Sequence, residues 1–401
     1  MKRCPAQSVF APWRLYKFVL CICIPVFILF FTQRLDAKQF PDCSICHKLK
    51  FQGKTLHPVI KTGGCVACHT QPHEKEAKPR KFLFATGTDL CFSCHDKTKF
   101  THSVKHPPVA EGRCLACHDV HNSDNPSLLL LPMPDLCFGC HGKTMFENHS
   151  IHPPVAGGKC TSCHDPHSAE ANKLLLKPSP DLCFICHDKT LFYGKMRVHG
   201  PVDNGQCVLC HDPHAGKGEK LLRDQIPNVC FRCHSEKKIM GLKVKHPPVA
   251  GGMCMTCHQP HQADFKRLLR SKLPDLCYSC HDKMIFTHKN VHPVVSAGLC
   301  VVCHEPHSSL KPAMLNTSIY DLCLQCHPKV AKELHIAGGF TEASHPLKDR
   351  VDPKAKDGQL TCASCHSHHS SDYMLLFRYP AAKPSELCQA CHKYSREPKK
   401  K

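Results

Sequence analysis

Long apolar segments and aromatic side chains are scarce in this sequence. Its 401 residues include a single Trp and 7% aromatic residues, but 33 Pro. A globular chain of this length usually forms two or three domains, each around its own apolar core. Because large apolar residues in periodic runs are so few, the polypeptide alone cannot build such cores, and another apolar component is expected.

No cysteine outside the N-terminal segment stands alone. Thirty of the 33 cysteines form fifteen C-x-x-C pairs, and a histidine directly follows every pair, whereas Cys4, Cys21 and Cys23 lie near the N-terminus. The fifteen blocks are Cys43, Cys46 and His47; Cys65, Cys68 and His69; Cys91, Cys94 and His95; Cys114, Cys117 and His118; Cys137, Cys140 and His141; Cys160, Cys163 and His164; Cys183, Cys186 and His187; Cys207, Cys210 and His211; Cys230, Cys233 and His234; Cys254, Cys257 and His258; Cys277, Cys280 and His281; Cys300, Cys303 and His304; Cys323, Cys326 and His327; Cys362, Cys365 and His366; and Cys388, Cys391 and His392.

The chemistry of these blocks has three interpretations. A single C-x-x-C with a nearby histidine can bind zinc, form a redox disulfide or attach a c-type haem. Zinc sites do not require a histidine directly after the second cysteine, yet all fifteen pairs have one. Two thiols three residues apart can form thioethers to the two vinyl groups of a haem, and the adjacent histidine then binds the iron as proximal ligand. The pattern therefore predicts fifteen covalently attached haems c, whose porphyrins supply the missing core.

Nineteen further histidines remain, and most of them fall into two sets. The His-Pro set, in which a histidine precedes Pro or Gly-Pro, comprises His57, His106, His152, His199, His246, His292 and His345. The downstream set, which follows a proximal histidine by three or four residues, comprises His73, His121, His167, His214, His261, His307 and His369. A downstream histidine stays on the proximal side of its own haem, so it is expected to serve a neighbour. The His-Pro set lies in backbone biased to extended conformation, which suits a ligand that reaches the second face of an iron.

The two sets offer fourteen second ligands for fifteen irons. The fifteenth ligand has several candidates, and that iron also has the alternative of an open position. The candidates are His102, His149, His288, His335, His368 and Met374. The sequence does not assign each histidine to an iron.

The blocks form an internal repeat. From Cys91 to Cys323 they recur every 23 or 24 residues, and "PDLCFxCHDK" alternates with "HPPVAGGxCxxCHDPH". Units that touch mainly their neighbours form quasi-one-dimensional arrays. We therefore expect an elongated tandem array of two-haem repeats, mostly coil with short α-helices and little or no β-sheet. The predicted regions are a leader at residues 1–37, an N-terminal haem pair at 38–90, tandem repeats at 91–322, and a three-haem region with a basic tail at 323–401.

Charge and the N-terminal segment indicate the compartment. The formal net charge of +20 would suit a nucleic-acid-binding protein, but two propionates per haem offset most of it, so no nucleic-acid partner is expected. Residues 1–37 combine basic residues, an apolar stretch from Phe18 to Phe31 and Ala37. This arrangement favours a signal peptide, with an uncleaved membrane anchor as the alternative. Because haem c is attached outside the cytoplasmic membrane, a periplasmic or other extracytoplasmic location is expected.

The alternation of "DLCFxCHDK" and "HPPVxxGxCxxCHDPH" resembles the doubled-CXXCH multihaem c-type cytochromes of respiratory bacteria. Within that group it is most similar to the periplasmic decahaem cytochromes of porin–cytochrome conduits for extracellular electron transfer. The resemblance covers residues 43–392. It implies a continuous chain of low-potential haems, each bound by two histidines, that carries electrons between redox proteins. The partners it implies are an inner-membrane quinol oxidase and outer-membrane porin–cytochrome proteins.

The sequence is also compatible with two other functions. A multihaem reductase would need an open iron, and the Cys388 haem is its candidate because no patterned histidine follows it. No C-x-x-C-K block, which marks such a site in some reductase families, is present. We therefore expect no enzymatic activity. The remaining alternative is a subunit of a conductive cytochrome filament.

Overall fold

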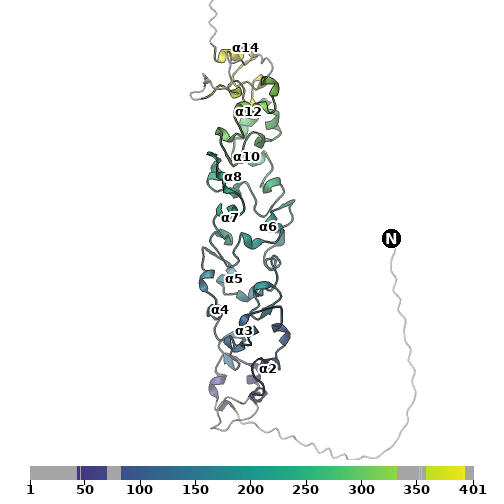
Figure 1. The fold of residues 1–401 in the computed structure, drawn as a ribbon, viewed down its shortest axis with the longest axis vertical. Coiled ribbons are helices and arrows are strands. Elements are labelled where there is room, and N and C mark those ends of the chain that lie inside the picture. Colours follow the sequence, from purple (N-terminus) through teal and green to yellow (C-terminus); the bar gives the residue numbers. More distant parts are fainter. Residues whose placement is uncertain are drawn as a thin grey trace, which may run out of the picture.

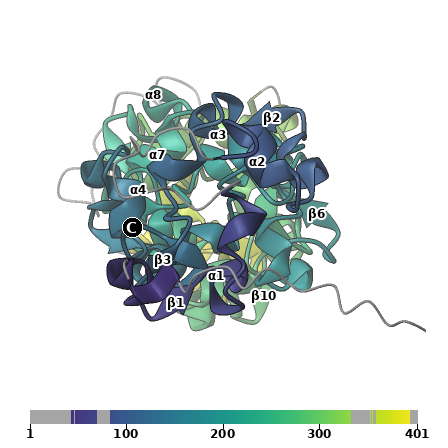
Figure 2. The ribbon, with the colours of Figure 1, turned by 90° about the horizontal axis from the view of Figure 1, so that it is seen from below.

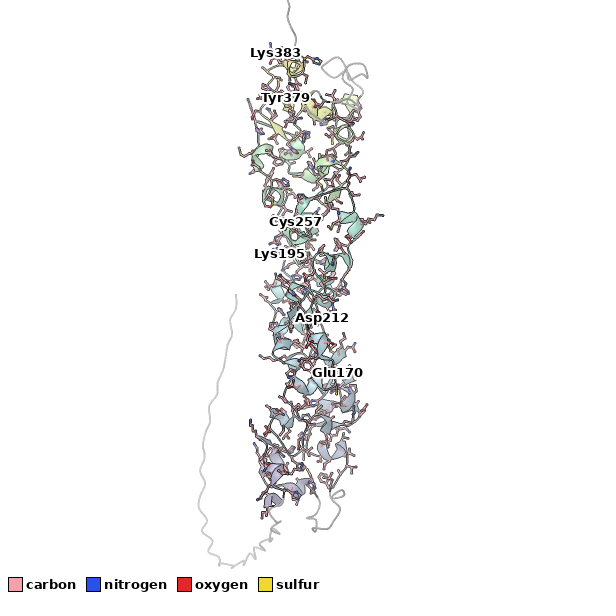
Figure 3. The ribbon with its side chains drawn as sticks, turned by 90° about the vertical axis from the view of Figure 1, so that its left-hand side faces the viewer. Glu170, Lys195, Asp212, Cys257, Tyr379 and Lys383 are labelled. Atoms are coloured by element: carbon pink, nitrogen blue, oxygen red, sulfur yellow. The ribbon has the colours of Figure 1, made fainter. Side chains whose placement is uncertain are left out.

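The computed structural model describes residues 43–45, 47–69, 83–331, 352, 354 and 358–392. These residues form a long column, with the repeats following one another from the N-terminal to the C-terminal end (Figure 1). Seen along the column, the elements of successive units lie around a common axis (Figure 2). Side chains cover the column along its length, with Glu170 nearer one end and Tyr379 nearer the other (Figure 3). The predicted elongated tandem array is confirmed.

Short α-helices occur at fixed points of the repeat. One group follows the His-Pro histidines, because Pro at the first helical position has a suitable φ and needs no hydrogen-bond partner. This group is α1 (Pro58–Lys61), α3 (Pro107–Ala110), α5 (Pro153–Ala156), α6 (Gly200–Asp203), α9 (Pro247–Ala250) and α11 (Pro293–Ser296). A second group covers the first cysteine of four "DLC" blocks and of the equivalent "NVC" block: α2 (Thr88–Phe92), α4 (Asp135–Phe138), α7 (Asn228–Phe231), α10 (Asp275–Tyr278) and α12 (Ile319–Leu324). The others are α8 (Glu236–Met240), α13 (Cys362–Cys365) and α14 (Pro384–Leu387).

Single 3-10 turns make up most of the other regular structure. Those over C-x-x-C are η1 (Cys43–Ile45), η3 (Cys65–Ala67), η5 (Cys114–Ala116), η8 (Cys160–Ser162), η10 (Cys183–Ile185), η12 (Cys207–Leu209), η14 (Cys254–Thr256), η17 (Cys300–Val302) and η21 (Cys388–Ala390). Those after a proximal histidine are η2 (Lys48–Phe51), η4 (Lys97–Phe100), η7 (Lys143–Phe146), η11 (Lys189–Leu191), η16 (Lys283–Phe286) and η19 (Pro328–Ala331). Those in the apolar links are η6 (Pro126–Leu128), η9 (Asn172–Leu174), η13 (Glu219–Leu221), η15 (Lys266–Leu268), η18 (Pro312–Met314) and η20 (Met374–Leu376).

Two-residue antiparallel ladders connect each unit to the next. The strand before a His-Pro histidine pairs with the strand after the downstream histidine of the following unit. The ladders are β1 (Thr55–Leu56) with β3 (Asn122–Ser123), β2 (Val104–Lys105) with β5 (Ser168–Ala169), β4 (Ser150–Ile151) with β7 (Ala215–Gly216), β6 (Arg197–Val198) with β9 (Gln262–Ala263), β8 (Val244–Lys245) with β11 (Ser308–Ser309), and β10 (Asn290–Val291) with β12 (Ser370–Ser371). The prediction of little or no sheet agrees with these short ladders.

Proline rings and glycines close the packing within each unit. Gly158 has φ +67°, and a Cβ there would lie 2.8 Å from Cδ of Pro134. Gly205 has the same φ, and a Cβ there would lie 2.7 Å from Cδ of Pro180. Only glycine combines this backbone conformation with so close an approach. The second Gly of "HPPVAGG" therefore holds each such block against the "PDLC" segment before it.

The polypeptide by itself has almost no apolar core. The buried apolar side chains of the described residues are Ala169, Ala215, Val229, Ala263, Phe377 and Ala381. Large apolar side chains instead stay exposed, and Leu115, Leu191 and Met284 are 61%, 64% and 71% exposed. Apolar surface on this scale needs a cover, and the porphyrin rings expected at each block are apolar groups of suitable size.

Candidate haem-binding sites

Each C-x-x-C-H block folds as a tight turn that presents its thiols and imidazole together. In the Cys160 block, the His164 amide donates a hydrogen bond of 3.0 Å to the Cys160 carbonyl. The same bond occurs in the described blocks from Cys65 to Cys388, with lengths of 2.8 to 3.1 Å. The turn keeps both cysteines and the histidine on one short stretch of chain. This donor set, repeated from block to block, fits covalent attachment of haem c.

The imidazoles of different blocks meet in pairs. Among the described residues, twelve proximal rings each face one ring from the His-Pro or downstream set, with ring centroids 5.9 to 6.4 Å apart. Six pairs use the downstream set: His69 with His121, His118 with His167, His164 with His214, His211 with His261, His258 with His307, and His304 with His369. Six use the His-Pro set: His95 with His57, His141 with His106, His187 with His152, His234 with His199, His281 with His246, and His327 with His292.

The ring spacing leaves room for one metal ion. Two metal–nitrogen bonds of about 2.0 Å each, added to two imidazole radii, separate the ring centroids by about 6 Å. Ten of the twelve pairs have interplanar angles of 10° to 37°. The pairs His57–His95 and His292–His327, the first and the last of the six His-Pro pairs, are inclined at 75° and 77°.

Hydrogen bonds to Nδ1 orient the proximal rings. In six blocks Nδ1 of the proximal histidine lies 2.8 to 2.9 Å from the carbonyl oxygen of the residue nine positions later, and these pairs are His118 with Ser127, His164 with Lys173, His211 with Lys220, His258 with Arg267, His304 with Ala313, and His366 with Leu375. A carbonyl only accepts, so Nδ1 carries the proton and Nε2 keeps its lone pair for a metal.

The His-Pro histidines are oriented in the same way. Nδ1 of His106, His152, His199 and His246 lies 2.9 to 3.1 Å from the carbonyl of the Pro that precedes a downstream histidine. Their backbone is extended, with φ −65° and ψ 131° at His106, as predicted for a residue before Pro. Their Nε2 atoms therefore remain available to a metal as well.

Burial keeps the downstream histidines neutral, and an acidic residue fixes the turn that carries them. Burial lowers the pKa of His121, His167 and His214, and it lowers the pKa of His369 to about 4. The neutral imidazole is the form that binds a metal. In "CHDPH", the Asp accepts the amide hydrogen bond of the downstream histidine, as in the 2.8 Å bond from His167 to Oδ1 of Asp165. This turn directs the ring toward the proximal histidine of another block, as His167 faces His118.

The two sets of histidines are also linked to each other. The amide of each described His-Pro histidine donates to the carbonyl of one downstream histidine, at 2.8 to 3.1 Å. The linked pairs are His57 with His121, His106 with His167, His152 with His214, His199 with His261, His246 with His307, and His292 with His369. Each link continues a β-ladder by one residue. The ladders between units therefore place the second ligands of two adjacent blocks side by side.

Neighbouring thiols connect the blocks in sequence order. The pKa of the first cysteine is raised, by burial first and by the neighbouring thiol second, in four "DLC" blocks and in the equivalent "NVC" block. The neighbours are Cys91 with Cys114, Cys137 with Cys160, Cys183 with Cys207, Cys230 with Cys254, and Cys277 with Cys300. Cys323 and Cys362 are hydrogen-bonded neighbours of the same kind. At the other junctions, the neighbours are the second cysteines of two consecutive C-x-x-C pairs. They are Cys68 with Cys94, Cys117 with Cys140, Cys163 with Cys186, Cys210 with Cys233, Cys257 with Cys280, Cys303 with Cys326, and Cys365 with Cys391. From Cys65 to Cys391 every block thus lies beside the next.

No residue pattern predicts the turn that supplies the Nδ1 acceptors. In each apolar link, two consecutive non-glycine residues have φ of 51° to 62°, as at Lys173 and Leu174. This region costs about 1–2 kcal/mol for an ordinary residue, and glycine or asparagine usually marks it. Neither residue type occupies these positions. The geometry is held because the bent chain bonds both the proximal imidazole and the amide after it, as in the 2.8 Å bond from Asp165 N to the Leu174 carbonyl.

Aromatic rings pack beside the downstream histidines. The ring centroid of Phe100 lies 5.0 Å from that of His167, and Phe146, Phe192 and Phe286 make the equivalent contacts to His214, His261 and His369. In the unit formed by the Cys230 and Cys254 blocks, Ile239 occupies the position equivalent to these phenylalanines. These contacts fix the orientation of imidazoles that no Nδ1–carbonyl bond holds.

Several leftover histidines have other partners. Nδ1 of His102 lies 2.8 Å from Oε1 of Glu170, and Nδ1 of His288 lies 3.2 Å from Oδ2 of Asp372. Both contacts join one unit to the next. His368 is stacked edge-on to His369, with centroids 4.3 Å apart. His102 and His288 therefore act as bridges between units in this structure.

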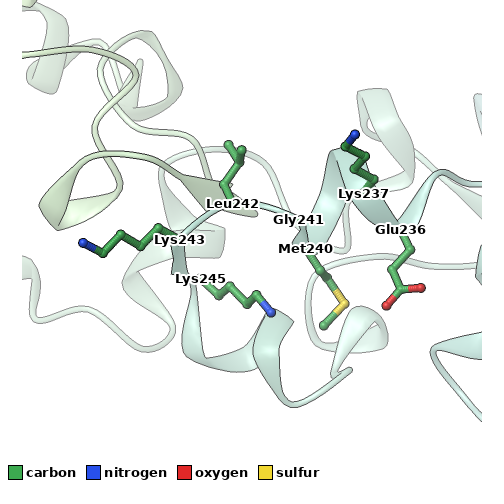
Figure 4. Close-up of a pocket in the computed structure, with 7 residues that line it drawn as sticks. All are labelled: Glu236, Lys237, Met240, Gly241, Leu242, Lys243 and Lys245. Carbon is green, nitrogen blue, oxygen red and sulfur yellow. The ribbon is translucent and has the colours of Figure 1, made fainter.

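The unit formed by the Cys230 and Cys254 blocks carries a shallow pocket. Ser235 is the N-cap of α8, and its Oγ accepts the Lys238 amide at 3.3 Å. The pocket has a volume of about 600 Å³ and is lined by Glu236, Lys237, Met240, Gly241, Leu242, Lys243 and Lys245. Lys237 and Lys243 point away from each other (Figure 4). None of the residues that line the pocket is a cysteine or a histidine, although Lys245 directly precedes His246.

Several sequence predictions fall outside the described residues. They are the leader at residues 1–37, Cys46, His73, His335 and His345, together with the side chain of Cys43. Within the described ranges, no helix has both the length and the apolar character needed to cross a membrane. The predicted region boundaries at residues 38, 91 and 323 stay predictions.

Comparison with known families identifies the class. The model of the doubled CXXCH motif matches the chain seven times, at residues 57–100, 106–146, 152–191, 199–239, 246–286, 292–332 and 353–397. The chain belongs to this family and is a multihaem c-type cytochrome with about fourteen covalently bound haems. Each matched range holds two C-x-x-C-H blocks, and six of the ranges begin at a His-Pro histidine. A search of curated proteins finds no match.

Membership of this family has two consequences. Multihaem c-type cytochromes transfer electrons, so the predicted electron-transfer function is confirmed at this level. Covalent attachment of haem c normally takes place outside the cytoplasm, as the predicted extracytoplasmic location requires.

Proposed function

We propose that this protein is a fifteen-haem electron carrier in which bis-His haems form one continuous path along the column. The observation that carries the proposal is the series of twelve imidazole pairs at iron-spanning distance, arranged in register with neighbouring thiols from Cys65 to Cys391. The fifteenth haem is the one that the Cys43 block would hold, which lies outside the seven matched ranges.

Each haem supplies an iron that exchanges one electron between its ferric and ferrous forms. The chain's own residues fix where that exchange occurs. The cysteines would hold the haem through thioethers, and the proximal histidine and a ladder-linked histidine from the preceding or the following unit would bind its iron. Two imidazole ligands give lower potentials than a histidine and a methionine. Low potentials suit a carrier in anaerobic or extracellular respiration.

We also propose that the partners are other redox proteins and that the carrier works in the periplasm or at the outer membrane, with no catalytic reaction of its own. The resemblance to decahaem cytochromes of porin–cytochrome conduits supports this setting. An inner-membrane quinol oxidase and an outer-membrane porin–cytochrome complex are then the donor and acceptor, and residues 1–37 act as export signal or anchor. End-to-end assembly into a filament is the structural alternative.

Electron paramagnetic resonance of the oxidised full-length protein, with haem counted by pyridine haemochrome, tests the proposal. Fifteen haems that are all low-spin are expected, and cyanide and nitrite should leave the spectrum unchanged. A high-spin haem that binds nitrite or hydroxylamine would contradict the sealed carrier and support a reductase. Electron microscopy of the same sample separates a soluble particle from a filament.

A further inference from the structure

Two positions of the repeat change their charge along the column. They belong to the blocks that an apolar link follows, and we call these the link blocks. The link blocks whose links are described throughout begin at Cys114, Cys160, Cys207, Cys254, Cys300 and Cys362. The residue directly after their proximal histidine is, in chain order, Asp119, Asp165, Asp212, Gln259, Glu305 and Ser367. The residue twelve positions after that histidine is Leu130, Leu176, Arg223, Arg270, Asn316 and Arg378. The charge at these positions therefore differs from block to block.

The residue after the proximal histidine lies close to the ligands of two irons. It adjoins the proximal histidine of its own block, and it contacts the downstream histidine that pairs with an earlier block. Oδ1 of Asp165 lies 2.8 Å from the amide nitrogen of His167 and 3.8 Å from its Nδ1. Oδ1 of Asp119 lies 2.8 Å from the amide nitrogen of His121 and 3.9 Å from its Nδ1. Within the described part of the chain, neither carboxylate forms an ion pair with a lysine or an arginine, although the charge of Lys50 reaches Asp119.

In the Cys207 block an arginine neutralises the carboxylate. Nη1 of Arg223 lies 3.1 Å from Oδ2 of Asp212. Nε of Arg223 donates a 2.6 Å hydrogen bond to the carbonyl of Val208, which lies between the two cysteines of the block. The ion pair is therefore fixed beside the site of haem attachment, and it has no net charge. In the two preceding link blocks a leucine occupies the position of Arg223.

The first two link blocks differ in the number of unpaired carboxylates near their irons. The iron of the Cys114 block has Asp119 after its proximal histidine and Asp165 beside its second ligand. The iron of the Cys160 block has Asp165 after its proximal histidine. Beside its second ligand lies Asp212, which Arg223 neutralises. The Cys114 iron therefore has two unpaired carboxylates nearby and the Cys160 iron has one.

The third link block has none. The iron of the Cys207 block has the ion-paired Asp212 after its proximal histidine. Its second ligand, His261, lies two residues after Gln259, which is neutral. All three irons have equivalent imidazole pairs, with ring centroids 6.0 to 6.1 Å apart. Nearby charge is therefore what distinguishes these three sites.

Farther along the column, opposite charges occur at one site. Nη1 of Arg270 donates a 3.0 Å hydrogen bond to the carbonyl of Met255 in the Cys254 block. Oε1 of Glu305 lies 3.3 Å from Nδ1 of His307, the second ligand of the same iron. These two charges counteract each other. The inference therefore concerns the first three link blocks alone.

A negative charge beside a haem stabilises the ferric form over the ferrous form, because the ferric form has one more positive charge. Partial burial preserves this effect, since solvent and salt screen an exposed charge more strongly. The side chains of Asp165 and Asp119 are 37% and 35% exposed. Charge and burial around a haem are among the means by which a protein sets its potential.

We propose that these carboxylates make the reduction potentials of the link-block haems rise from Cys114 through Cys160 to Cys207. The proposal rests on the electron-transfer function above and adds a direction to it. Electrons pass spontaneously from a lower to a higher potential, so this segment favours flow toward the C-terminal end of the column. The electron donor is then expected at the N-terminal end of the segment and the acceptor at its C-terminal end.

The test is a spectroelectrochemical titration of the full-length, haem-loaded protein carrying Arg223→Leu. This substitution leaves Asp212 unpaired, so the components of the Cys160 and Cys207 haems should move to lower potential with the haem count unchanged. Arg223→Lys keeps the charge and should titrate like the wild type. Arg223→Leu/Asp212→Gln removes both charges and should also titrate like the wild type. A shift that persists in the double variant would show that the arginine acts through packing, and it would overturn the proposal.

A second variant tests the same idea in the opposite direction, even where Arg223→Leu fails to mature. Leu176 is 47% exposed, so an arginine can be accommodated there, and Leu176→Arg places a cation at the position equivalent to Arg223 in the block of Asp165. The components of the Cys114 and Cys160 haems should move to higher potential. An unchanged titration would overturn the proposal.

Variants that each lack one haem give the order of the potentials. The difference between the wild type and Cys114→Ala/Cys117→Ala should lie at a lower potential than the difference obtained with Cys207→Ala/Cys210→Ala. Equal or reversed potentials would overturn the proposal. Low-spin spectra of all haems in the wild type would still support the carrier function, so the two ideas fail separately.

Discussion

At the scale of single residues, the partner of Nδ1 decides what an imidazole can do. In His164 and His106 a backbone carbonyl accepts from Nδ1, so Nε2 is free to bind iron. In His102 and His288 a carboxylate occupies that position, and the imidazole joins two units. The same residue type therefore has two roles, which are distinguished by the group that contacts Nδ1.

The substitution His167→Met tests this assignment. Because the His167 ring faces that of His118, the haem at Cys114 should rise in potential, by on the order of 0.1–0.3 V within the roughly 0.8 V that axial ligands span. The haem at Cys160, in the block that precedes His167, should keep its potential. A redox titration with haem counting measures both. The control His102→Gln should leave every potential in place, and an unchanged titration for His167→Met would contradict its role as a ligand.

At the scale of elements, short turns of fixed shape stabilise the fold in place of an apolar core. The second glycine of "HPPVAGG", and its equivalents Gly205 and Gly298, have positive φ and pack against a proline ring, which locks the two halves of a unit together. The strands that follow the downstream histidines carry small side chains, and Ser168 and Ala263 are 1% and 2% exposed. Small residues there allow the ladder between units to form.

Replacing Gly205 by Ala should therefore weaken the array. The new Cβ would lie 2.7 Å from Cδ of Pro180 at a backbone φ of +67°, and we expect a loss of about 1–3 kcal/mol in the free energy of unfolding. Denaturant unfolding followed by the haem absorbance measures it. Gly142→Ala is the matched control, because φ is −62° there and nothing lies within 4 Å of the added Cβ. Equal stability of the two variants would contradict this packing.

Sequence reasoning reached some of these elements and not others. The turns over C-x-x-C-H and the extended backbone at His106 follow from local chemistry, so they could be predicted. The pairing of His118 with His167 could not, since it depends on a ladder that joins residues from different units. The left-handed turn at Lys173 and Leu174 was also out of reach, because its residues carry no glycine or asparagine signal.

At the scale of the whole molecule, the blocks follow one another in one row. Electron transfer from one end to the other therefore needs every block of that row. Cys207 neighbours Cys183 on one side, and Cys210 neighbours Cys233 on the other. Electron transfer slows steeply with distance, so the variant Cys207→Ala/Cys210→Ala should lower end-to-end conductance of single molecules by at least tenfold. Removing the first block with Cys43→Ala/Cys46→Ala should leave transfer between the remaining blocks unchanged. Equal conductance in the first variant and the wild type would show a path that bypasses this block.

The most direct measurement of the central claim is an iron anomalous-scattering map from crystals of the haem-loaded protein. Each iron from the Cys65 to the Cys323 block should lie midway between the two imidazoles paired above, so that the iron of the Cys114 block sits between His118 and His167. The irons should follow one another in block order along the column. An iron of the Cys114 block that is bound on its second face by another residue, or by none, would contradict the pairing and with it the continuous bis-His path.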